Sequence, residues 1–193
     1  DYDHWASLGN EGWSYDEILK YFKKAEHNET FDDQFHGQGG PLNVSKIRHE
    51  NKPTKDFVEA GSKLYKHNED FNGEEQEGIG FYQTTQKDGK RCSTAKAYLV
   101  PALDRPNLTV ITEANVNKIL IDNQKASGVE YIDAEGQSHI VSASKEVLLC
   151  SGAFGSPQIL LRSGVGPKGE IEKHGIEHKV DLPGVGKNLQ DHI

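Results

Sequence analysis

The three residues Ser151-Gly152-Ala153 are the part of the chain most suited to holding a ligand. They follow an apolar run that ends at Cys150, and they precede a segment with helix-forming features. Small residues at the carboxyl end of a buried strand let a ligand approach the backbone, and open α/β sheets bind their ligands there. The same small residues also let a helix pack closely on a strand. The local sequence favours neither interpretation.

Other candidate motifs are weaker. Residues 164–169 spell GxGxxG, but a helix is predicted before this motif and Pro167 lies inside it, whereas a dinucleotide loop needs a strand before it and a helix opening at the turn. A helix stop followed by a turn is therefore expected. None of the nine histidines lies in an HExxH motif, and surface or capping roles are expected for them. His192, beside Asp191, is the histidine of most interest, and no metal site is predicted.

Two helices are predicted in the first part of the chain. Ser14 and Glu17 have the spacing of a capping box, and an apolar stripe follows them until the pattern fades at 26–28. A second helix is predicted from about Pro53, with apolar residues at helical spacing. A short extended run is expected at 42–44, and the acidic segment 68–77 is expected to be a solvated loop.

Alternating apolar residues from Leu108 onward predict a small β-meander with a tight turn at 134–136. The expected strands are 108–112, 116–121, 128–132 and 139–143. Residues 146–150 are expected to form a strand: after Glu146 they are continuously apolar, which is typical of a central parallel strand, and Cys150 is expected to be buried there. Ser156, Pro157 and Gly164 then predict the N-cap, first residue and stop of a helix.

Composition excludes several classes of protein. A net charge of −8 disfavours nucleic acid as a partner, because phosphates need a basic face. No stretch approaches the roughly 20 apolar residues of a membrane span, so a cytoplasmic protein is expected, with membrane association left open. Cys92 and Cys150 have no metal-ligand or disulfide-framework spacing, and Cys92 is expected in a polar loop.

Several stretches together resemble the glucose–methanol–choline (GMC) oxidoreductase family, and most closely its choline dehydrogenase-like and alcohol dehydrogenase (acceptor) members. The most specific stretch runs from Gly152 to Gly166 and matches the second signature of that family. The resemblance covers essentially the whole chain. Its other stretches are 1–6, 12–15, 91–99, 105–110 and 182–192.

The resemblance implies FAD as the cofactor, a small-molecule primary alcohol as the substrate, choline-like or other, and hydride transfer to flavin N5. It implies a mixed α/β fold in which part of a Rossmann-like FAD-binding domain is interleaved with part of a substrate domain. Residues 1–105 would belong mainly to the substrate domain and 106–193 to the FAD-binding domain. The dinucleotide loop and catalytic histidine of the family would lie outside the chain, so no catalytic residue is assigned and the segment alone is expected to be inactive.

The resemblance also assigns cofactor contacts. Val116 matches the position whose backbone meets the adenine of FAD, and Ser151, Gly152 and Ala153 match the turn along the ADP half. This favours the ligand-binding interpretation of that turn. The alternative to an enzyme segment is a non-catalytic binding or interaction domain derived from the same fold.

Overall fold

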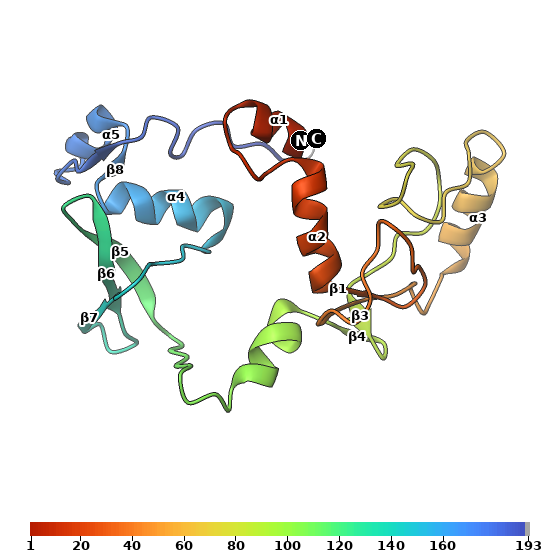
Figure 1. The fold of residues 1–193 in the computed structure, drawn as a ribbon, viewed down its shortest axis with the longest axis horizontal. Coiled ribbons are helices and arrows are strands. Elements are labelled where there is room, and N and C mark those ends of the chain that lie inside the picture. Colours follow the sequence, from red (N-terminus) through yellow and green to blue (C-terminus); the bar gives the residue numbers. More distant parts are fainter. Residues whose placement is uncertain (192–193) are drawn as a thin grey trace. The chain divides into compact units, whose positions relative to one another are not determined.

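A computed structural model describes residues 1–191 as a mixed set of helices and short strands in two compact units. The first unit is Asp1–Thr109 and the second begins at Val110. Figure 1 shows the elements of both units.

The first unit begins with two helices, α1 (Tyr2–Ser7) and α2 (Tyr15–Ala25). The predicted capping box of α2 is confirmed: Glu17 Oε2 accepts hydrogen bonds from the backbone N–H of Ser14 at 3.2 Å and from its hydroxyl at 2.6 Å. The helix ends where β1 (Glu26–Asn28) begins, and β1 pairs in parallel with β2 (Leu42–Val44). The extended run expected at 42–44 is therefore present.

The rest of the first unit consists of short elements. Helix α3 (Lys52–Gly61) begins close to the predicted position, with the Asn51 side chain accepting a hydrogen bond from Thr54 N–H. Strands β3 (Gln86–Lys87) and β4 (Lys90–Arg91) form a small antiparallel pair. They are followed by a π-helix, η1 (Ala95–Leu99), and a 3-10 helix, η2 (Val100–Ala102).

The second unit contains the predicted β-meander, with one strand fewer than expected. Strands β5 (Asn115–Asp122), β6 (Lys125–Ile132) and β7 (Ser138–Ser142) form an antiparallel sheet in that order. The strand predicted at 108–112 is wrong, because that segment pairs with no strand in the described part of the chain. Glu113, with a φ of 54°, also breaks the extended backbone before β5.

Helix α4 (Gly152–Arg162) follows the sheet, and its N-cap is Ser151, five residues before Ser156, the predicted N-cap. The prediction was wrong because the Ser156 hydroxyl accepts a hydrogen bond from Ser151 N–H at 3.0 Å, which draws the preceding residues into the first turn. Pro157 thus lies inside the helix, which loses one backbone hydrogen bond there. Strand β8 (Val165–Gly166), helix α5 (Lys168–Lys173) and strand β9 (Val180–Asp181) complete the unit.

Residues 146–150 do not form the predicted central strand. A central strand needs a hydrogen-bonded partner on each side, and within residues 1–191 no strand pairs with this run. Leu148 is consequently 78% exposed and Cys150 is exposed rather than buried. Cys92 lies in a loop between β4 and η1, as expected, but its side chain is buried, with Sγ 3.9 Å from the carbonyl oxygen of Pro41.

The core of each unit is small. The buried apolar residues of the first unit are few, with Ile18 on α2 and Val58 on α3 among them. In the second unit, Ile119 of β5, Ile159 of α4 and Ile171 of α5 are buried. No helix in the described residues is both long enough and apolar enough to cross a membrane.

Candidate cofactor-binding site

The Ser151-Gly152-Ala153 turn forms the start of α4, where the sequence predicts ligand contacts. All three residues are exposed. Gly152 has a φ of +80°, and a Cβ built there would meet no atom within 4 Å, so the glycine is required by the backbone conformation and leaves open space beside it. The first N–H groups of a helix have no intrahelical acceptor and carry partial positive charge, so they attract anions. The residues present therefore fit an anionic group such as a pyrophosphate.

Residues 184–190 lie beside the first part of α4. A groove of about 560 Å³ lies between α4 and residues 184–190, and Ala153, Phe154 and Pro157 line its α4 side. Local patterns did not predict this juxtaposition, because the two segments are distant in sequence. The one signal for residues 184–190 was their family resemblance. The adjacent His192 lies outside the described residues.

Val116, the other predicted contact, lies on β5 opposite Tyr131 of β6. The register shifts between Val116 and Lys118, so the intervening Asn117 lies in an irregularity of the ladder. Val116 is half-buried and is not part of the groove beside α4. The structure thus places Ala153 on a cavity wall and Val116 on the sheet, without bringing them together at one cavity.

Helix α4 is fixed to β5 by polar contacts at its C-terminal end. The buried Ser163 hydroxyl accepts a hydrogen bond from Ile119 N–H at 2.8 Å and donates to the carbonyl of Ile159 at 2.6 Å. Arg162 donates to the Asn117 side chain. These contacts hold one end of α4 against the sheet and leave its glycine turn exposed.

Charged groups gather beside the same end of α4. The hydrogen bond from Asn117 lowers the pKa of Glu130, assisted by the charges of Lys118 and Arg162 against an opposing effect of burial. Lys118 Nζ lies 3.4 Å from Glu130 Oε2. Because each cation here has a protein partner, this cluster stabilises the packing of α4 on β5 and offers no free positive charge for a ligand.

The GxGxxG motif behaves as the sequence predicted. Gly164, with a φ of 84°, comes directly after the C-cap of α4, and the motif continues into β8 rather than opening a long helix. Among the histidines, His174 and His178 have the HxxxH spacing of a helical metal site. Helix α5 ends at Lys173, however, so this pair does not lie on one face of a helix.

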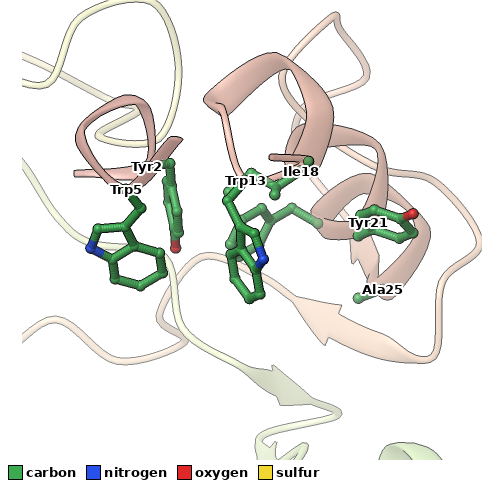
Figure 2. A pocket seen from close by; sticks show the side chains of 8 residues that line it. Tyr2, Trp5, Trp13, Ile18, Tyr21 and Ala25 are labelled. Carbon is green, nitrogen blue, oxygen red and sulfur yellow. The ribbon is translucent and has the colours of Figure 1, made fainter. Parts of the chain in front are cut away.

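A different cavity is lined almost entirely by aromatic and aliphatic side chains. It has a volume of about 690 Å³ and lies between α1 and α2. Figure 2 shows Tyr2 and Trp5 from α1, Trp13 from the connecting loop, and Tyr21 and Ala25 from α2 around it. Tyr2 packs edge-on against Trp5 at a centroid distance of 5.2 Å. The groove presents a mainly apolar surface, and Tyr2 and Tyr21 supply its hydroxyl groups.

Comparison with known proteins identifies the family. The sequence profile of the GMC oxidoreductase family matches residues 1–193. The chain is 47% identical over 196 residues to alcohol dehydrogenase (acceptor) from Pseudomonas putida and 43% identical over 194 residues to oxygen-dependent choline dehydrogenase from Sinorhizobium fredii. It covers 36% and 35% of these relatives, respectively, and is itself covered completely.

Solved structures show the same fold. Pyridoxine 4-oxidase from Mesorbium loti matches 99% of the chain with a TM-score of 0.90 at 33% identity, and the chain covers 38% of it. An FAD-dependent oxidoreductase from Chaetomium thermophilum matches 98% of the chain with a TM-score of 0.91 at 31% identity, and the chain covers 35% of it.

These matches confirm the expected fold class, a mixed α/β chain with part of a Rossmann-like FAD-binding domain, and they support FAD as the cofactor. The chain spans only a little over a third of the length of the relatives named above. Since the family profile matches from the first residue to the last, the chain belongs to the GMC oxidoreductase family.

Proposed function

We propose that this chain supplies one wall of the FAD site in an oxidoreductase that oxidises a primary alcohol, choline-like or other, to the aldehyde. The observation that carries the proposal is the family match over the whole chain, which includes the exposed glycine turn of α4. Among similar proteins, the names alcohol dehydrogenase and choline dehydrogenase support an alcohol as the substrate class. When bound, the flavin would accept a hydride from the alcohol carbon.

In this proposal the residues of the chain bind and orient the cofactor. Gly152 and Ala153 are exposed, and their N–H groups would hold the ADP half, while the backbone of Val116 would contact the adenine. Residues 106–193 would belong to the FAD-binding domain and residues 1–105 mainly to the substrate domain. The division of the chain into units close to residue 109 supports this assignment.

The unpaired run 146–150 fits the same proposal. It is apolar on both faces and leads directly into the glycine turn. In a longer protein, strands from other parts of the chain would pair with it on both sides and bury Leu148. The glycine turn would then lie at the carboxyl edge of a parallel sheet, where this class of fold binds its ligands.

A matched pair of glycine substitutions in the full-length enzyme tests the role of the turn. Gly152 and Gly136 have φ values of 80° and 81°, and neither would place a Cβ within 4 Å of another atom. Gly152→Ala and Gly136→Ala should therefore strain the backbone equally. We expect Gly152→Ala to weaken FAD binding by about tenfold, equivalent to about 1.4 kcal/mol, and Gly136→Ala to leave it unchanged.

Bound flavin is measured by its visible absorption after dialysis, together with the FAD dissociation constant. Equal FAD affinity in the two variants would contradict a cofactor contact at Gly152. If the full-length protein bound no flavin at all, the chain would instead belong to a non-catalytic member of the fold.

A further inference from the structure

A buried histidine in the first unit lies between two aspartates from different loops. The side chain of His36 is only 2% exposed. Its Nδ1 atom lies 2.9 Å from Oδ1 of Asp33, and its Nε2 atom lies 3.4 Å from Oδ1 of Asp70. One ligand atom from each of the three residues lies within 4.8 Å of the others. The sequence predicts no metal site here, because Asp70 belongs to the acidic segment 68–77, which was expected to be solvated.

The hydrogen bonds define which ring nitrogen carries the proton. Asp33 Oδ1 accepts hydrogen bonds from the backbone N–H groups of Phe35 at 2.8 Å and His36 at 3.1 Å. An oxygen that accepts these two N–H groups is also an acceptor toward the ring, so Nδ1 of His36 must be the donor to Asp33.

This assignment leaves Nε2 of neutral His36 with a lone pair that faces a second carboxylate. Nε2 is buried and has no hydrogen-bond partner in the described part of the chain. Asp70 Oδ1 is also an acceptor, since it receives a hydrogen bond from Asn72 N–H at 3.0 Å. Two acceptors that face each other in a buried place need a cation between them, either a proton or a metal ion.

The distance decides between the two cations. A charge-assisted hydrogen bond from an imidazolium to a carboxylate brings N and O to about 2.7–2.9 Å. Nε2 and Oδ1 are 3.4 Å apart and lack hydrogen-bond geometry. A tetrahedral Zn²⁺ with bonds of about 2.0–2.2 Å separates two of its ligand atoms by about 3.4 Å. The spacing matches two ligands of one metal ion.

We propose that His36 Nε2 and Asp70 bind a divalent cation of the Zn²⁺ class, which joins the loop around His36 to the loop around Asp70. Asp33 orients the imidazole through Nδ1, as carboxylates commonly do for histidines that bind metals. His36 and Asn72 also line a groove of about 400 Å³, from which water would complete the shell.

The surrounding structure holds the ligands in place before any cation binds. Lys23 Nζ donates to the carbonyl oxygens of Asp33 at 3.1 Å and Gln34 at 2.9 Å, which anchors the His36 loop to α2. Asp70 N–H donates to the buried Asn68 side chain at 2.8 Å. Such preorganisation lowers the entropy that binding must overcome.

Calorimetric titration of the chelator-treated, full-length protein with Zn²⁺ tests this site, and Co²⁺ serves as a spectroscopic probe of tetrahedral geometry. We expect one ion per chain. His36→Gln and Asp70→Asn should weaken its affinity at least tenfold, and Asp33→Asn should weaken it by about 10–100-fold. Glu69→Gln is the control: Glu69 is exposed, adjacent to Asp70 and paired with Lys46, so its loss should leave the affinity unchanged.

Gly73→Ala covers the possibility that the ligand variants fail to fold. Both ligands and Asp33 remain, but the added Cβ would lie 2.2 Å from Asp70 Oδ2 and would move that carboxylate. We expect weaker Zn²⁺ binding with an unchanged circular dichroism spectrum. Failure of the protein to take up Zn²⁺ or Co²⁺, or equal uptake by His36→Gln, would overturn the proposal and assign a proton to the position between Nε2 and Asp70.

Discussion

At the scale of single residues, Ser163 connects the helix and the sheet of the second unit through one hydroxyl group. Ile119 N–H lies on the edge of β5 that no other strand covers in the described residues, and Ser163 Oγ is its acceptor. Ser163 is 4% exposed, so the contact is largely shielded from water. The contact therefore satisfies a buried donor that the sheet itself leaves unpaired.

Replacement of Ser163 by alanine should destabilise the second unit by about 1–3 kcal/mol, because it leaves the Ile119 N–H buried without an acceptor. Urea unfolding followed by circular dichroism measures the change. Ser144→Ala, at an exposed bend in the same unit, is the control and should change stability by less than about 0.5 kcal/mol. Equal stabilities of the two variants would show that water reaches Ile119.

At the scale of elements, α2 depends on an ionised capping group. Hydrogen bonds from the Ser14 side chain and backbone lower the pKa of Glu17, with a smaller opposing effect of burial. A carboxylate with a lowered folded-state pKa stabilises the folded state at pH values above its unfolded pKa. That contribution is lost as the pH falls through the folded-state value.

Glu17→Gln should therefore lower the melting temperature at neutral pH, and its difference from the unaltered chain should shrink as the pH falls below the ordinary glutamate range. Thermal unfolding at a series of pH values measures this difference. Glu59→Gln on α3, at an exposed position, should show no such pH dependence. A pH-independent effect of Glu17→Gln would mean that the charge of Glu17 contributes nothing to the cap.

The elements also show what local sequence can predict. The capping box of α2 and the meander of β5, β6 and β7 were predicted because their signals lie within a few residues of each other. The strand at 146–150 was wrong because a strand depends on partners that local sequence does not reveal. The start of α4 was misplaced because the Ser156 side chain bonds backward to Ser151.

The same distinction applies to the candidate sites. The glycine turn at 151–153 was recognisable from its residues, and its contacts with FAD remain a prediction. The groove between α4 and 184–190 and the cluster at His36 required the folded chain, because each joins segments that are distant in sequence. Spacing rules find metal ligands that recur at fixed separations along the sequence, and His36 and Asp70 belong to no such pattern.

At the scale of the whole molecule, the two units expose more surface than compact proteins of their size. The solvent-accessible area is 14,786 Å², whereas two separate compact proteins of half the mass each would expose about 11,000 Å². Many large apolar side chains are exposed, among them Trp5, Trp13, Tyr21 and Phe22 around the groove between α1 and α2. Surfaces of this kind associate in water unless other protein covers them.

The isolated chain should consequently self-associate through the aromatic groove, with a sedimentation coefficient that rises with protein concentration. Trp5→Lys combined with Tyr21→Lys should weaken this association at least tenfold, because two charges would have to be buried in an apolar contact. Tyr65→Lys, at a residue of the first unit that is 66% exposed and lies outside the groove, should leave it unchanged. If the unaltered chain sediments as a monomer at all concentrations, the prediction is wrong. If the unaltered chain and both variants associate equally, the contact involves another apolar surface, such as that around Leu148 and Phe154.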